Sequence, residues 1–307
     1  MYVPALALEL PALLLGLLFG SFLNVCIARL PHGESIVAPR SRCLHCHSTI
    51  RWYDNIPILS WLLLRRRCRD CGQPIPARYP LVELATGAWF ALAAMYLARA
   101  IDLHTVSLPT AVLAFLSSAT LGFLLLGLMV MDWEMMLLPN AFTYTGIFLG
   151  LLLTCAHAVF LGPHEDQIDL SSHHIRLASP GNVVDRGNLF LTGPEALIMG
   201  RVAAVAGVAL LLLTIRGLYK LVRKREGMGL GDVKLLAMMA AFLGFAPTLF
   251  ALFAGVMAAF VYAVILLLRG RAGATTRLPF GSFLAAGGLF AALFGRPFID
   301  AYMQLFR

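Results

Sequence analysis

Charged residues are scarce in this chain. Only 13% of its 307 residues are Asp, Glu, Lys or Arg, whereas 60% are hydrophobic and the mean hydropathy is +0.81. This composition leaves too little polar surface to cover a soluble globule of this length. It excludes a soluble enzyme and predicts an all-α polytopic membrane protein.

Apolar stretches that reach, or nearly reach, the length needed to cross about 30 Å of hydrocarbon occur about eight times. They run approximately over residues 5–28, 81–98, 109–131, 141–161, 196–215, 233–246, 248–268 and 280–295. No basic residue precedes the first stretch in MYVPALALEL, so a cleaved signal peptide is not expected. The pairs Gly16 with Gly20 and Gly146 with Gly150 are typical of helices that pack closely in lipid.

The basic residues are unevenly distributed among the loops. Alternate loops lie on opposite sides of the membrane, and loops 29–80, 216–234 and 269–279 hold nine, six and three Lys or Arg, 18 of the chain's 24. Because cytoplasmic loops are rich in Lys and Arg, we expect these loops to be cytoplasmic and both termini external. Residues 162–195 are then a long external loop. The net charge of +8 reflects this topology and an affinity for anionic lipid, and no basic surface interleaved with aromatic residues predicts nucleic-acid binding.

The first cytoplasmic loop holds four of the six cysteines. They form two C-x2-C pairs with 21 residues between them, Cys43 with Cys46 and Cys68 with Cys71. Each such turn aims two thiolates inward, and a tetrahedral Zn²⁺ held by all four would fix a loop too small for its own core. The alternative is two disulfides, which a reducing compartment disfavours. The spacing therefore predicts one structural zinc ion per chain, with no ligand position left for water.

Other potential ligands near these cysteines are assigned no function. His45 and His47 flank Cys46, but four thiolates already complete a closed site. Cys26 and Cys155 lie in apolar stretches, where a free cysteine usually behaves as a small hydrophobic residue.

Two aspartates stand where apolar stretches meet the predicted cytoplasmic side. Asp132 follows the apolar run in LMVMDWEMMLLPN, and Asp232 lies in GMGLGDVKLLA, where a charged turn enters an apolar run. Either residue alone is also explained as a charge that marks the membrane boundary or as a helix cap. Both share one membrane face, however, and an ionisable group at this depth normally faces the bundle interior with a partner. We therefore expect Asp132 and Asp232 to form a pair.

The chemistry of such a pair is that of an aspartic protease. Two close carboxyl groups cannot both ionise near neutral pH, so they share one proton. The ionised member would take a proton from a bound water while the protonated member polarises the scissile carbonyl. We expect Asp232 to be the ionised member, because it opens a helix whose N-terminal end favours negative charge. Gly229 and Gly231 would allow left-handed backbone and close approach of the substrate chain.

Several blocks of the sequence resemble the type IV prepilin peptidase family of GxGD-type intramembrane aspartic proteases. Besides the cysteine pairs and the two aspartate segments, the resemblance rests on GSFLNVCIARLP, NIPILSWLLLR, RYPLVELATG and LPFGSFLAAGG, in this order along the chain. It covers most of the chain. It implies that Asp132 and Asp232 are the catalytic aspartates and that the four cysteines are the family's metal-binding tetrad.

The resemblance also implies a function. Members of the family are bifunctional enzymes of the bacterial inner membrane that remove the basic leader of type IV prepilins and pseudopilins on the cytoplasmic side, after a glycine. Those with the cysteine loop also N-methylate the exposed residue with S-adenosylmethionine. This chain would then serve type IV pili and type II secretion. No glycine-rich methyl-donor loop on a Rossmann-type unit is present, so methyl transfer rests on the resemblance and the cysteine loop.

The family's pattern is not matched everywhere. The family often has Asp-x-Asp at the first catalytic residue and an acid after Leu-Pro, where this chain has Glu134 and Asn140. A substrate or cofactor contact by Glu134 therefore stays open. Glu83, in RYPLVE, is expected to contact the cofactor, a substrate amine or an arginine. Lys234 is expected either to act electrostatically on the neighbouring carboxyl or to extend to the membrane interface.

Three regions are expected: a first transmembrane helix at 1–28, a cytoplasmic zinc-binding domain at 29–80, and a transmembrane peptidase core at 81–307 with an external loop at about 162–195. Two alternative functions remain open. One is a membrane peptidase without methyltransferase activity. The other is a proton-coupled or cation-coupled transporter that uses the two aspartates.

Overall fold

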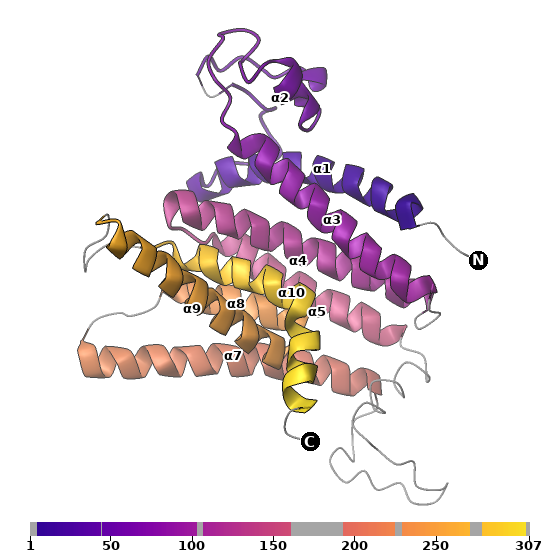
Figure 1. Ribbon diagram of the computed structural model, residues 1–307, viewed down its shortest axis with the longest axis vertical. Coiled ribbons are helices and arrows are strands. Elements are labelled where there is room, and N and C mark those ends of the chain that lie inside the picture. The colour runs from indigo at the N-terminus through magenta and orange to yellow at the C-terminus, as the bar shows by residue number, and fades with distance from the viewer. Residues whose placement is uncertain are drawn as a thin grey trace, which may run out of the picture.

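Long helices form a bundle from which one loop projects (Figure 1). The structure, a computed structural model, describes residues 5–43, 45–102, 107–160, 193–224, 229–270 and 278–304. Its long helices are α1 (Ala5–Arg29), α3 (Arg78–Asp102), α4 (Leu108–Met135), α5 (Asn140–Val159), α7 (Gly193–Arg223), α8 (Leu230–Leu243), α9 (Phe245–Leu268) and α10 (Phe280–Gln304). Across the described residues, β pairing is confined to two isolated bridges. The predicted all-α class is confirmed.

Six of these helices are long and apolar enough to cross a membrane, namely α1, α3, α4, α5, α7 and α9. Each predicted apolar stretch coincides with one of the long helices. However, α8 has only 14 residues, about 21 Å at 1.5 Å per residue, which is less than the hydrocarbon thickness. The apolar part of α10 is Phe280–Gly295. The chain is therefore a multi-pass membrane protein, and the count of eight spans stays a prediction.

Two of the predicted loop boundaries are wrong. α7 continues to Arg223, so the predicted loop 216–234 begins as helix, because its Leu, Lys and Arg residues favour helix and it contains no proline. The helix ends where Lys224 takes a left-handed conformation. α3 begins at Arg78, which shortens the predicted loop 29–80. The predicted external loop 162–195 lies outside the described residues except for its last three, which begin α7.

The predicted small-residue pairs lie at helix contacts. A Cβ atom added to Gly16 of α1 would lie 2.8 Å from the Cα atom of Gly87 in α3, and Gly20 lies equally tightly against the same helix. Gly146 and Gly150 of α5 lie against side chains of α8. Because lipid is as apolar as these side chains, such close packing is what holds helices together in a bilayer.

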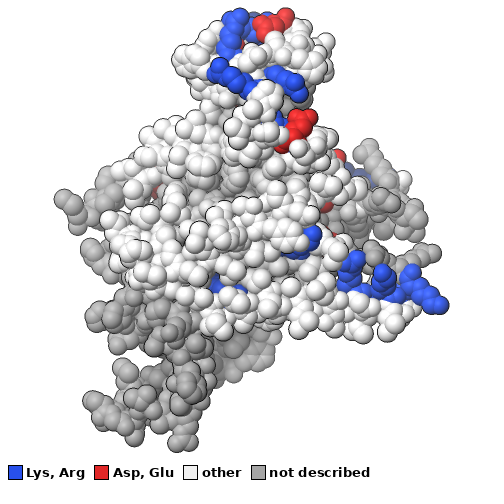
Figure 2. All heavy atoms as spheres, turned by 180° about the vertical axis from the view of Figure 1, so that it is seen from behind, with Lys and Arg blue, Asp and Glu red and all other residues white. Residues whose placement is uncertain are grey.

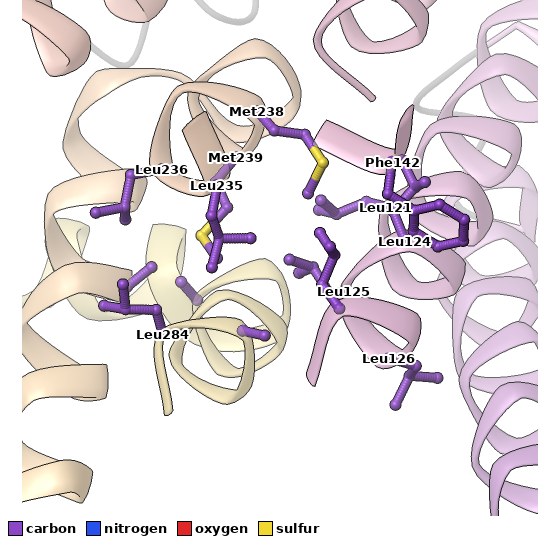
Figure 3. Close-up of a cluster of buried hydrophobic side chains, with 14 of the residues drawn as sticks. Leu121, Leu124, Leu125, Leu126, Phe142, Leu235, Leu236, Met238, Met239 and Leu284 are labelled. Atoms are coloured by element: carbon purple, nitrogen blue, oxygen red, sulfur yellow. The ribbon is translucent and has the colours of Figure 1, made fainter. Parts of the chain in front are cut away.

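The core of the bundle is formed where α8 inserts among its neighbours (Figure 3). Side chains of α8 face α4, α5 and α10. The core residues labelled in the figure are Leu235, Leu236, Met238 and Met239 from α8, Leu121, Leu124, Leu125 and Leu126 from α4, Phe142 from α5 and Leu284 from α10. The four α8 side chains have no exposed surface. Because Asp232 lies in the first turn of α8, this packing also fixes the position of that carboxyl group.

The projecting loop contains the short helices η1 (Leu30–His32), η2 (Trp52–Asn55) and α2 (Leu59–Leu63). In Figure 1 it lies near the end of the bundle at which α1, α4, α7 and α9 finish and at which α8 and α10 begin. Seen from behind, Lys and Arg gather on the loop and at one end of the bundle, while most of the remaining visible surface is uncharged (Figure 2).

Candidate functional site

Asp132 and Asp232 lie at the same end of the bundle. Asp132 is in the last turn of α4 and is 6% exposed, and Asp232 is half-buried in the first turn of α8. The two carboxyl groups are close enough for the charge of Asp132 to act on Asp232. The structure thus places the two predicted partners within electrostatic reach of each other, and their catalytic role stays a prediction.

Ser282 of α10 holds the Asp132 carboxyl group. The backbone N–H of Ser282 donates to Oδ2 of Asp132 at 2.7 Å. The Ser282 hydroxyl lies 3.1 Å from the same oxygen and 2.8 Å from the Met129 carbonyl oxygen. Donors on one carboxylate oxygen fix its orientation and stabilise negative charge on it, which favours Asp132, and not the expected Asp232, as the ionised member. Sequence reasoning missed Ser282, and its only signal was its place in LPFGSFLAAGG.

Glycines allow the segments around the dyad, the pair formed by Asp132 and Asp232, to approach closely. A Cβ atom added to Gly281 would lie 3.0 Å from Cγ of Asp132, and one added to Gly231 would lie 3.1 Å from Cδ1 of Leu138. The expected left-handed backbone at Gly229 and Gly231 is wrong. Gly229 is extended, with φ −71° and ψ 151°, and Gly231 is helical, because α8 begins directly after Gly229. Close approach is thus what the missing Cβ atoms provide.

The two remaining polar residues predicted near the dyad link helices to each other. Glu134 of α4 forms an ion pair with Arg78 of α3 at 2.5 Å. Lys234 of α8 donates to Oδ1 of Asn140 at 2.7 Å and lies 5.0 Å from the centre of the Tyr144 ring, both in α5. These contacts join α4 to the first turn of α3, below the projecting loop, and α8 to α5.

Glu83 is buried beneath the projecting loop and is 8% exposed. Its Oε2 atom accepts from the backbone N–H of Ile58 at 2.7 Å, and the Ser21 side chain of α1 also bonds to it. Among the described residues, the ion pairs do not include Glu83, so the arginine partner, one of its three predicted alternatives, is not found there. Glu83 instead lines a cavity between the loop and the bundle.

The four cysteines of the loop converge on one point. Their sulfur atoms all lie within 4.8 Å of one another, and the sulfurs of Cys43 and Cys71 are 3.8 Å apart. Tetrahedral Zn²⁺ with bonds of about 2.3 Å places sulfur atoms about 3.8 Å apart. All six cysteines of the chain are free thiols. This arrangement favours one four-thiolate site over two disulfides, and its donor set suits zinc.

The described residues of the two C-x2-C turns make the same backbone hydrogen bonds. The N–H groups of Cys43 and Cys68 each bond to the carbonyl five residues later. His47 and Gly72, which directly follow the second cysteine of each turn, are left-handed and donate back to the carbonyl of the first cysteine. The backbone of each turn thereby aims both of its thiols to one side.

An ion pair joins the second turn to the rest of the loop. The guanidinium of Arg69 donates to both carboxylate oxygens of Asp54, at 2.8 and 2.6 Å. These hydrogen bonds from Arg69 hold the pKa of Asp54 below its ordinary value. The pair connects η2 to the segment between Cys68 and Cys71.

Two family models match the chain. The bacterial peptidase A24 N-terminal domain matches residues 14–97, and the type IV leader peptidase family matches residues 181–264. The first match contains the cysteine loop and Glu83, and the second contains Asp232. Asp132 lies between the two matched segments.

Several curated relatives that carry the name prepilin leader peptidase/N-methyltransferase match over most of the chain. The protein from Burkholderia pseudomallei is 34% identical over 94% of this chain and 85% of its own length, and that from Stutzerimonas stutzeri is 31% identical over 98% and 96%. The protein from Myxococcus xanthus is 37% identical over 85% of this chain, which spans 64% of that relative. No solved structure matches the chain. Since the alignments with the first two span nearly the whole of both proteins, this chain belongs to the prepilin leader peptidase/N-methyltransferase family.

Proposed function

We propose that this chain removes the leader peptide of type IV prepilins and pseudopilins and then N-methylates the new N-terminal residue, with S-adenosylmethionine as the methyl donor. Both activities are named for its relatives, and a type IV leader peptidase model matches the chain. The observation that carries the peptidase half is the pair of carboxyl groups, Asp132 and Asp232, at one end of an apolar bundle.

In the proposed peptide cleavage, the two aspartates divide the work. The ionised carboxylate takes a proton from a bound water as the water oxygen attacks the scissile carbonyl carbon. The protonated carboxyl donates a hydrogen bond to the carbonyl oxygen, and a proton passes to the leaving amine as the C–N bond breaks. Ser282 keeps the Asp132 carboxyl group in place. Gly229 leaves room for the substrate chain beside Asp232, whereas the space beside Gly231 is taken by Leu138.

We propose that the dyad and the loop face the cytoplasm of a bacterium. The concentration of Lys and Arg on the loop and at one end of the bundle supports this orientation. Asp132, Asp232 and the foot of the loop lie at one end of the bundle (Figure 1). A leader that has not crossed the membrane would therefore meet the dyad directly.

We propose that Cys43, Cys46, Cys68 and Cys71 hold one structural Zn²⁺ per chain. The mutual distances of their sulfur atoms support this assignment. The ion would cross-link the two turns of a loop with little core of its own, and four thiolates leave no open position for substrate. We also propose the division into a first helix at residues 1–28, the metal-binding loop at 29–80 and the core at 81–307. The start of α3 at Arg78 and the end of α7 at Arg223 shift the loop boundaries as described above.

The proposal is tested with paired assays on one purified prepilin. Asp132→Asn and Asp232→Asn should each reduce leader removal on the order of 10³-fold, because each removes a group that the reaction requires. Methyl transfer from labelled S-adenosylmethionine to an already cleaved pilin should persist. Glu9→Gln, at the far end of α1, serves as the matched control. Cleavage that persists in both Asn variants would favour the transporter, and absent methyl transfer in the wild type would favour the peptidase alone.

A further inference from the structure

A cavity of about 420 Å³ lies between the projecting loop and the bundle. Ser21 and Asn24 of α1 and Tyr79 and Glu83 of α3 line its bundle side, and residues of the loop line the rest, Trp61 among them. Cavities of roughly 300 to 1,000 Å³ commonly hold one small ligand or cofactor. The size suits a single molecule of nucleoside dimensions better than a peptide chain.

A buried carboxyl group on the cavity wall has no positively charged partner among the ion pairs of the described residues. Glu83 accepts hydrogen bonds from Ile58 and Ser21, but the ion pairs of the described residues do not include it. A buried charge is normally retained where a counter-charge balances it. The protein supplies hydrogen-bond donors to Glu83, and a ligand that enters the cavity can supply the cation.

The cavity wall also carries a buried acceptor without a partner. Asn24 is 3% exposed, and its side-chain N–H donates to the Tyr79 carbonyl at 3.0 Å. That bond fixes the amide orientation, and its Oδ1 atom has no hydrogen-bond partner. Buried acceptors are almost always paired in folded proteins. A ligand that brings an N–H group to Asn24 would satisfy this oxygen.

Apolar side chains form much of the exposed cavity wall, and charged residues, among them Arg29, Arg42, Arg51, Arg69, Asp54 and Asp70, also line it. Val25 of α1 and Ile56, Ile58 and Trp61 of the loop contribute hydrocarbon and aromatic surface. The ligand that fits is therefore partly apolar, carries a positive charge and offers an N–H donor. S-adenosylmethionine has this combination, with a sulfonium cation, a flat adenine ring and an adenine amino group.

We propose that this cavity is the methyl-donor site, with Glu83 beside the sulfonium cation and Asn24 Oδ1 accepting from the adenine amino group. The assignment rests on the methyltransferase half of the proposed function. The donor would supply a methyl group: its S–CH3 bond would break as a bond forms to the unprotonated α-amine of the pilin, leaving a neutral thioether, and the methylated nitrogen would lose one proton to water. Cys43 and Cys68 line the same cavity, so the order of the cysteine loop decides its shape.

The test compares two ligands that differ in the sulfonium charge. S-adenosylmethionine and S-adenosylhomocysteine are titrated calorimetrically into the full-length, zinc-loaded chain in lipid nanodiscs. Glu83→Gln keeps the side-chain shape. It should raise the dissociation constant of S-adenosylmethionine at least about tenfold and that of S-adenosylhomocysteine less than about threefold, because only the first ligand carries the sulfonium charge. Asn24→Ala should weaken both ligands by a similar factor. Glu9→Gln is the control, and zinc content and elution volume verify that each variant is folded.

Several outcomes would overturn the proposal. Equal losses for both ligands in Glu83→Gln, or no loss, would show that Glu83 does not face the sulfonium. If the affinity for a synthetic basic leader peptide falls instead, the cavity is a leader site. Ultraviolet cross-linking of labelled donor should mark α1, α3 or the loop. Marks elsewhere in a chain that methylates pilin would reject the cavity alone, whereas a wild type that neither binds donor nor methylates pilin would reject the proposed function as well.

Discussion

The projecting loop and the dyad end of the bundle hold their reactive side chains in place in opposite ways. In the loop, two short turns with local hydrogen bonds present four thiols, and few buried side chains surround them. In the bundle, Asp132 and Asp232 lie on separate helices, and fully buried Leu and Met side chains pack these helices against each other and against their neighbours. Order in the loop should therefore depend on a metal ion, and order at the dyad on helix packing. The two centres should fail independently.

Loss of one loop cysteine should give the largest difference between the effect on the loop and the effect on the dyad. Cys43→Ser or Cys68→Ser should lower zinc content from one per chain to none and reduce methyl transfer about 100-fold, because the loop over the cavity loses its cross-link. Leader cleavage should fall less than about tenfold, since the dyad relies on helix packing. Metal analysis and the paired assays measure this, with Cys155→Ser as control. Equal losses in both assays would contradict the separation.

The converse change should disturb the dyad and spare the loop. In Gly281→Ala the added Cβ atom would lie 3.0 Å from Cγ of Asp132, so the carboxyl group or α10 must shift. Small displacements of a catalytic group are costly, and we expect cleavage to fall about 10- to 100-fold with zinc content unchanged. Gly200→Ala, whose Cβ atom would meet nothing within 4 Å, is the matched control. If Gly281→Ala cleaved at the wild-type rate, the contact of the added Cβ atom with Asp132 would not matter for cleavage.

A smaller effect should follow from removing one donor to Asp132. Ser282→Ala deletes the hydroxyl and keeps the backbone N–H, so we expect kcat for cleavage to fall about tenfold with KM unchanged. Ser282→Thr retains the hydroxyl and should recover part of the rate. Steady-state kinetics with a prepilin peptide separate the two constants. A rise in KM alone, or no recovery with Thr, would assign Ser282 a packing role.

The smallest effect concerns the ion pair within the loop. Arg69 lowers the pKa of Asp54 in the folded chain. The stabilisation of the loop by this ion pair is therefore complete above the pKa of Asp in the unfolded chain, about 3.9. It is lost as the pH falls through the lower pKa of the folded chain. Asp54→Asn should lower the melting temperature slightly near pH 7, since the pair is near the surface, and the difference from wild type should vanish in acid. Asp70→Asn is the control. A difference that persists in acid would contradict the charge-based explanation.

Much of the architecture follows from local patterns in the sequence. The apolar stretches coincide with the long helices because a backbone in lipid must satisfy its hydrogen bonds internally. The two C-x2-C turns assemble from hydrogen bonds spanning at most five residues, so their spacing was sufficient to predict the cluster. The left-handed backbone that Gly229 and Gly231 would allow is not found, because α8 begins at Leu230 and the last three residues of GMGLGD already belong to it.

The composition and motif order alone specified a helical membrane protein, a cysteine cluster and two acids on one membrane face. The contacts of Ser282 with Asp132 and of Asn24 with Tyr79 emerged only from the folded chain. Ser282 bonds to Asp132 across 150 positions and Asn24 to Tyr79 across 55. Contacts at such separations depend on how several helices pack together, and helix periodicity carries information about which side of a helix is apolar but none about which neighbour it meets.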